Sequence, residues 1–269
     1  MTGRLAAGLL LMMLAACAAP TRNVELAVLD DDAGYRFHTI NHGTHDETLV
    51  VMTMSGGGTR AAALATGALR GLQAATFTDQ TPLAAEIDIL SSVSGGSVTA
   101  AYFARHGYDG LARLEQDFLR QDVVGDLFAA GLNPVNLARL PTPSYARIDW
   151  LIAAFRKRLF AADVRYRALL QDQVTRPYLI LNAGDMTAET PFPFTQDRFD
   201  LICSDLVEME LSQAVAASAA FPGALSALTL TNFAPCDAQE EAWPDHPPLR
   251  IINPLSTSAY DDPQARRRA

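Results

Sequence analysis

The chain has 269 residues, of which 49% are hydrophobic and 19% are charged. This size and composition suit one sizeable α/β domain with a substantial core, and leave too little chain for two full domains. The net charge of -9 provides no basic footprint for DNA or RNA, so we expect no nucleic-acid partner.

The N-terminus predicts a signal peptide over residues 1–16. Arg4 is followed by an apolar run, Leu5–Leu14, which is too short to span a bilayer. The run leads to Leu-Ala-Ala-Cys ending at Cys17, which resembles the lipobox of bacterial lipoproteins, whose cysteine is acylated. The resemblance implies export and a membrane anchor at Cys17, and Ala18 after it implies the periplasmic face of the outer membrane. A plain secretory signal is the alternative.

Export affects the interpretation of the other two cysteines, Cys203 and Cys236. In an oxidising compartment they are candidates for a disulfide, and two buried free thiols are the alternative. We interpret the polar residues 17–47, which contain His38, His42 and His45, as a solvated lead-in and linker. The five histidines lack ligand spacing with the cysteines, so the sequence predicts no metal and no cofactor.

The first strand, turn and helix unit begins at Thr48. Residues 48–55 are typical of a buried strand, Gly56-Gly57-Gly58-Thr59-Arg60 of a turn, and the Ala/Leu-rich residues 61–75 of a helix. Glycines at a helix N-terminus leave backbone N–H groups available to negative charge. One use is a dinucleotide phosphate loop, but no acidic residue ends a second strand about 20 residues further on. The other use is an oxyanion hole.

A second such unit covers residues 87–105. Ile87–Leu90 predicts a buried strand, the small apolar residues after Gly96 predict a helix, and Ser94 lies at the corner between them. A serine at this corner is the pattern of a nucleophile elbow. Gly96 is suitably small two residues after Ser94. Ser92 stands where glycine is usual, and we expect strain there if the turn needs a positive φ. An ordinary Ser/Gly-rich loop is the alternative.

The two turns together resemble those of the patatin-like phospholipase family of lipid acyl hydrolases. They read Ser-Gly-Gly-Gly-Thr-Arg over 55–60 and Ser-Val-Ser-Gly-Gly-Ser over 92–97. A third stretch agrees, with Asn-Ala-Gly-Asp-Met at 182–186 after a strand at 177–181, followed by residues 214–223 ending in Phe-Pro-Gly. The resemblance covers roughly residues 48–235.

The resemblance implies a role for individual positions. Ser94 would be the acyl-forming nucleophile, and Gly57 and Gly58 would supply the oxyanion N–H groups. Gly56 would shape that turn, while Arg60 would support it or meet a substrate phosphate. The substrate implied is a lipid or phospholipid ester.

The family pairs its serine with an aspartate from an Asp-Gly-Gly or Asp-Gly-Ala motif after Phe-Pro-Gly, and this chain lacks that motif. Its only Asp-Gly pair, Asp109-Gly110, precedes that segment and is expected just beyond the elbow helix. We therefore expect an enzyme domain that is incomplete at the C-terminus, and a catalytically inactive lipoprotein is the alternative. His246 with Asp185 or Asp205 could replace the base, although a surface histidine in a proline-framed loop is favoured.

The expected fold is a three-layer α/β/α domain over residues 48–269 with a mainly parallel central sheet. Residues 107–175 predict helices with irregular breaks. Within them Leu151–Phe160 reads either as a basic amphipathic face for anionic lipid or as an ordinary surface helix.

Overall fold

The computed structural model describes residues 22–40, 48–77, 80, 82–142, 145–170, 177–233 and 249–252. The expectations for the signal peptide, Cys17, Cys236 and His246 lie outside the described residues. No helix in the described part of the chain has both the length and the apolar character needed to cross a membrane.

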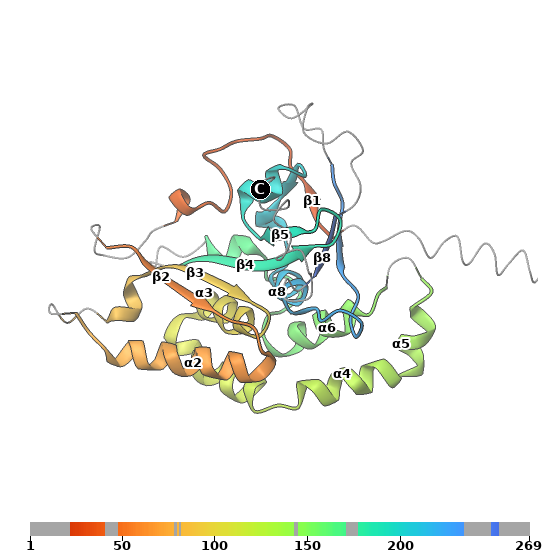
Figure 1. Cartoon of the computed structure of the whole chain (residues 1–269), viewed down its shortest axis with the longest axis horizontal. Coiled ribbons are helices and arrows are strands. Elements are labelled where there is room, and N and C mark those ends of the chain that lie inside the picture. Colours follow the sequence, from red (N-terminus) through yellow and green to blue (C-terminus); the bar gives the residue numbers. More distant parts are fainter. Residues whose placement is uncertain are drawn as a thin grey trace, which may run out of the picture.

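The centre of the molecule is a sheet with strand order β2-β3-β4-β8-β7, and a further strand, β5, pairs with β4 (Figure 1). The three longest strands, β2 (Val50–Met54), β3 (Ile87–Val93) and β4 (Tyr178–Asp185), are parallel. The short strands β5 (Thr190–Pro193), β7 (Leu228–Leu230) and β8 (Leu249–Ile252) join antiparallel. Strands β1 (Val24–Glu25) and β6 (Ser204–Asp205) form a separate pair. The predicted α/β class with a mainly parallel central sheet flanked by helices is confirmed.

The helices expected after the glycine turn and after the elbow are present, and so are helices in the expected region 107–175. They are α2 (Gly58–Ala74), α3 (Gly95–Leu114), α4 (Val123–Leu132), α5 (Pro134–Arg139), α6 (Ile148–Arg158), α7 (Gln196–Asp200) and α8 (Leu211–Ala219). Short helical turns cover Phe37–Thr39, Leu83–Glu86, Tyr166–Leu169 and Leu206–Glu208, and a π-helical turn covers Glu115–Leu119.

Helices α3 and α8 pack on the same side of β3 and β4, and α2 packs against α3 (Figure 1). The alternation along β3 explains this, because Leu90 and Ser92 are buried while their neighbours are half-buried. Small residues on α3, such as Ala100 and Ala101, are fully buried and allow the close approach. This packing holds the corner between β3 and α3 at the carboxyl end of a central strand of the sheet.

The N-terminal segment packs against the start of β4. The ring of Tyr35 stacks on that of Tyr178 with centroids 5.1 Å apart and meets the edge of Tyr166 at 5.3 Å. The hydroxyl of Tyr35 accepts a hydrogen bond of 2.7 Å from the backbone N–H of Leu179. Part of the predicted lead-in, residues 22–40, thus contributes to the core.

Helix α6 is the helix in which a basic lipid-binding face was one expectation. Its apolar residues Ile152 and Phe155 are buried in the core. The guanidinium of Arg156 donates two hydrogen bonds of 2.6 Å to the carboxylate of Glu210, which is 6% exposed. Arg158 forms an ion pair with Asp126 of α4. Two of the three basic side chains at the end of α6 are therefore paired with carboxylates of the protein itself.

Two boundaries differ from expectation. Asp109-Gly110 lies inside α3, which continues to Leu114 through a kink at Gly107, where φ is 61°. Strand β4 extends to Asp185, so the Asn-Ala-Gly-Asp stretch ends the strand instead of following it. The end of β4 pairs with β5, the other arm of a hairpin, and with the distant strand β8, and the pairing with β8 is not visible in local sequence.

Candidate active site

Ser94 lies between β3 and α3 in a conformation that few non-glycine residues adopt. Its φ is 55° and its ψ is -121°, so the strain falls on Ser94 itself. The turn needs no positive φ at Ser92, so the strain expected there under that condition does not arise. Ser92 is an extended strand residue whose buried hydroxyl lies 3.1 Å from that of Ser97. The corner thrusts the Ser94 side chain away from the sheet.

The two glycines after Ser94 are required by the close approach of the glycine loop in front of α2 and of the end of β2. A Cβ atom on Gly95 would lie 2.0 Å from the carbonyl oxygen of Gly58, and one on Gly96 would lie 2.6 Å from that of Met54. Real Cβ atoms do not approach backbone so closely. The elbow and the glycine loop are therefore in direct backbone contact.

The glycine loop uses conformations that favour glycine at two positions. Gly57, the residue before α2, has a φ of 140°, and Gly58, its first residue, has a φ of 65°. Gly58 and Ser94 line the same cavity, whereas Gly57 is not among the described residues that line it. The first N–H groups of a helix have no partner within the helix. The start of α2 thus brings N–H groups without a partner in the helix to the cavity that Ser94 lines.

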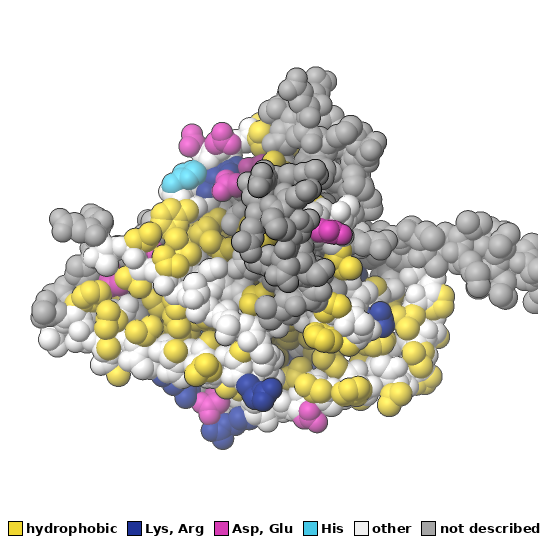
Figure 2. All heavy atoms as spheres, in the orientation of Figure 1, with side chains coloured by type: hydrophobic (Ala, Val, Ile, Leu, Met, Phe, Trp, Pro, Cys, Tyr) yellow, Lys and Arg dark blue, Asp and Glu magenta, His cyan; other side chains and the backbone are white. Residues whose placement is uncertain are grey.

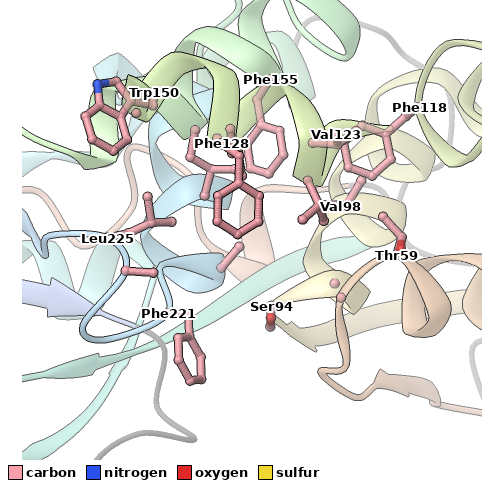
Figure 3. A pocket seen from close by; sticks show the side chains of 18 of the residues that line it. Thr59, Ser94, Val98, Phe118, Val123, Phe128, Trp150, Phe155, Phe221 and Leu225 are labelled. Carbon is pink, nitrogen blue, oxygen red and sulfur yellow. The ribbon is translucent and has the colours of Figure 1, made fainter. Parts of the chain in front are cut away.

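A cavity of about 510 Å³ opens in front of Ser94 (Figure 3). In Figure 3 Ser94 lies beneath Phe128, with Val98 and Thr59 on one side and Phe221 and Leu225 on the other. Further aromatic walls come from Phe118, Trp150 and Phe155. The described residues that line the cavity include no acidic or basic side chain and no histidine. The hydroxyls of Ser94 and Thr59 do not titrate near neutral pH. Such a cavity favours a hydrocarbon chain.

Behind the elbow, buried serine hydroxyls form a chain. The oxygens of Ser97 and Ser218 are 2.8 Å apart, and Ser218 donates its proton to the carbonyl of Asn182 at 2.7 Å. Each hydroxyl has one proton, so Ser97 must donate to Ser218, and Ser92 in turn to Ser97. Ser218 was part of a stretch noted in the sequence, but nothing local assigned it a role.

The hydroxyl of Ser94 makes no hydrogen bond to any described residue, and no carboxylate or histidine of the described chain lines its cavity. Asp185 instead accepts hydrogen bonds from the N–H groups of Thr187 and Ala188, and Asp205 accepts from Val207. Neither aspartate lines the cavity of Ser94, and their pairing with His246 stays a prediction because that residue lies outside the described chain. Among the described residues, none takes the place of the family's aspartate beside Ser94.

Arg60 lies in the first turn of α2 and is exposed. It has no hydrogen bond or ion pair with another described residue, and it does not line the cavity. Cys203 is disulfide-bonded, and its partner lies outside the described residues, so pairing with Cys236 stays a prediction. No group of three histidine, cysteine or acidic residues within the described ranges could hold a metal ion.

A serine at a strained strand-to-helix corner, beside a glycine loop and an apolar cavity, defines an α/β protein built around a nucleophile elbow. A model of the patatin-like phospholipase family matches residues 52–243, well over half of the 269 residues. The chain belongs to this family. No curated protein matches the chain.

Proposed function

We propose that the protein hydrolyses lipid acyl esters, of phospholipid or related type, with Ser94 as nucleophile. The observation that carries this is the apolar cavity of about 510 Å³ in front of the Ser94 hydroxyl. An acyl chain in this cavity would present its ester carbonyl to the elbow, because the hydroxyl of Ser94 is one of the few polar groups in a largely apolar wall.

In the proposed reaction the Ser94 oxygen attacks the carbonyl carbon, and the serine proton passes to the leaving alcohol. The carbonyl oxygen becomes negative in the transition state, and N–H groups at the start of α2 stabilise it there. Removing one such donor typically costs about 10² to 10³ in turnover. Water then cleaves the acyl-Ser94 ester to release a fatty acid and free serine.

Arg60 supports a phosphate-bearing head group. Arg60 follows Gly58 by two residues. Its side chain is exposed and has no hydrogen bond or ion pair with a described residue. Arginine binds phosphate oxygens in a bidentate manner, so a lipid whose chain fills the cavity can place its phosphate against this side chain.

A second candidate is an inactive family member that binds lipid without hydrolysing it. The observation in its favour is that no described residue of the cavity can remove the serine proton. An alcohol without a base remains a weak nucleophile at neutral pH.

Labelling with a fluorescent fluorophosphonate separates the two candidates. We expect the chain to be labelled and to release fatty acid from phosphatidylglycerol vesicles, Ser94→Ala to lose both, and Ser91→Ala to retain both. Ser91 is the matched control because it is a half-buried serine of β3, three residues before Ser94. Absence of both signals from the unaltered chain would favour the inactive form.

We propose further that the chain is exported and acylated at Cys17, which would hold it at the periplasmic face of the outer membrane. The motif at residues 14–17 supports this, as does the disulfide at Cys203, because disulfides persist in oxidising compartments. Incorporation of labelled palmitate that is lost in Cys17→Ser tests the anchor. Labelling retained in that variant would refute it.

A further inference from the structure

We propose that the outward surface of α4 and α5 is the docking surface through which the protein lies on a lipid bilayer. This apolar surface consists of Val124, Phe128, Leu132, Val135 and Leu137, whose side chains are between 47% and 79% exposed. The inference takes its lipid substrate from the proposed function, whereas the exposed apolar surface is observed independently of it. Figures 1 and 2 show the two helices at the lower right edge of the molecule, where hydrophobic side chains cluster.

Helix α4 is apolar on almost every side. Val124, Phe128 and Leu132 follow one another at intervals of four residues, so they form one exposed stripe along the helix. Val123 is buried on the inward side, and Leu127 packs partly against the core. A surface helix of a globular protein normally has polar side chains opposite its buried face. An exposed apolar stripe of this length therefore indicates a partner that is itself apolar.

The apolar surface is continuous with the cavity of Ser94. Val124, Phe128 and Leu132 line that cavity while remaining exposed, and so does Phe221, which is 67% exposed. These four side chains thus form the cavity's mouth. A lipid that enters here from a bilayer would reach Ser94 without moving its acyl chain through water, which removes the main cost of extracting it.

The charges around this surface are complementary to anionic lipid. Between residues 123 and 138 the only charged residue is Asp126, which is paired with Arg158. Residues 120–158 contain six basic and three acidic residues, a net charge of +3 in a chain whose net charge is -9. Arg120 and Arg156 are paired with Glu115 and Glu210 outside this range, so the cations that remain without a carboxylate partner among the described residues are Arg139, Arg147 and Lys157.

Basic side chains border the apolar surface. Arg139 ends α5, and Lys157 lies on α6 close enough to Asp126 to help lower its pKa, which the hydrogen bond from Arg158 lowers most. Lys157 forms no ion pair with a described residue. Apolar side chains surrounded by cations are the usual composition of a surface that binds anionic membranes.

Tryptophan fluorescence tests the contact directly, whether or not Cys17 is acylated. In the full chain Val135→Trp places a reporter on α5, and Leu64→Trp places a matched reporter on α2, where Leu64 is 73% exposed. The signal of the unaltered chain, with Trp150 and Trp243, is subtracted. On vesicles of phosphatidylethanolamine and phosphatidylglycerol with brominated acyl chains, we expect roughly two-fold quenching at position 135 and none at 64.

Other occupants of this surface give different results, and each overturns the proposal. Equal quenching at the two positions, or none at 135, means that the surface does not meet the bilayer. A blue shift of the position-135 signal with protein concentration, without vesicles, means that a second copy covers it. A shielded reporter in the dilute protein means that another segment of this chain covers it.

Activity provides a second readout. Val135→Glu with Leu137→Glu lowers hydrolysis of vesicle phospholipid about ten-fold, since charges must then enter the bilayer surface. Neither residue lines the cavity, so hydrolysis of a soluble short-chain ester stays unchanged. In the control variant Leu64→Glu, hydrolysis of the vesicle phospholipid and of the soluble ester both stay unchanged. Equal loss on both substrates overturns the proposal. If no variant hydrolyses any ester while position 135 is quenched, the proposed function fails and the docking surface stands.

Discussion

The backbone N–H of Ser94 donates a hydrogen bond of 3.0 Å to the hydroxyl of Ser218, 124 residues later in the chain. Ser218 is fully buried and gives its own proton to the carbonyl of Asn182 on β4. One hydroxyl therefore connects the elbow, α8 and the central sheet. A strained conformation such as that of Ser94 persists only where its surroundings over-determine it, and Ser218 is part of those surroundings.

Replacing Ser218 with alanine is expected to loosen the elbow. The substitution leaves the Ser94 N–H and the Asn182 carbonyl without this partner, which costs about 1–3 kcal/mol of unfolding free energy. Because Ser94 then loses a constraint, the rate of fluorophosphonate labelling per folded molecule also falls. Urea unfolding and labelling kinetics measure the two effects.

Ser204→Ala is the control for that experiment. Ser204 is equally buried, and its hydroxyl makes two hydrogen bonds, with the Asn23 amide and the Val24 carbonyl, where that of Ser218 makes three. We expect a similar loss of stability with an unchanged labelling rate. If Ser218→Ala were labelled as fast as the unaltered chain, the positioning role of Ser218 would be wrong.

Alanine at Gly95 is expected to separate the elbow from the glycine loop. Its Cβ would lie 2.0 Å from the Gly58 carbonyl oxygen, a backbone atom that cannot move without shifting the start of α2. Overpacking of this kind costs about 1–3 kcal/mol or more. The unfolding midpoint in urea should fall accordingly.

Gly71→Ala on α2 serves as the matched control. A Cβ there meets no atom within 4 Å, so alanine should stabilise the helix by about 1 kcal/mol. Two glycine-to-alanine substitutions are thus expected to change the free energy of unfolding in opposite directions. A neutral Gly95→Ala would contradict the close contact between elbow and loop.

Alkaline pH is expected to destabilise the fold through Tyr35, Tyr166 and Tyr178. Burial raises the pKa of all three above the usual value near 10, and the hydrogen bond from Leu179 offsets this only in part for Tyr35. Above about pH 10 the unfolded chain therefore binds fewer protons than the folded one. This contribution to stability is full below pH 10 and is lost as the pH rises towards the folded values.

Urea unfolding at about pH 8 and about pH 11, with tyrosinate absorbance as the second signal, measures this effect. Tyr35→Phe removes one of the titrating groups, so its stability should decline less steeply with pH. Equal stability of the unaltered chain at the two pH values would show that the three rings ionise while folded.

Much of the fold follows from local patterns. Short apolar runs before glycine turns predicted β2 and β3, and the Ala-rich and small-residue segments after them predicted α2 and α3. The ends of elements were less predictable. The end of β4 pairs with the distant strand β8, and the continuation of α3 past Gly107 depends on buried contacts of Leu111 and Leu114.

The sequence by itself determined the elements that meet at the elbow, because a strand, a turn of small residues and a helix have local signatures. It thereby indicated Ser94 and the glycine loop as the centre of the site. Only the tertiary structure decided that the strain lies on Ser94 and that Ser218 holds it. Only the tertiary structure, too, left the stripe of α4 exposed at the mouth of the cavity. These features depend on contacts between residues far apart in the chain, and local sequence carries no record of which surfaces such contacts bury.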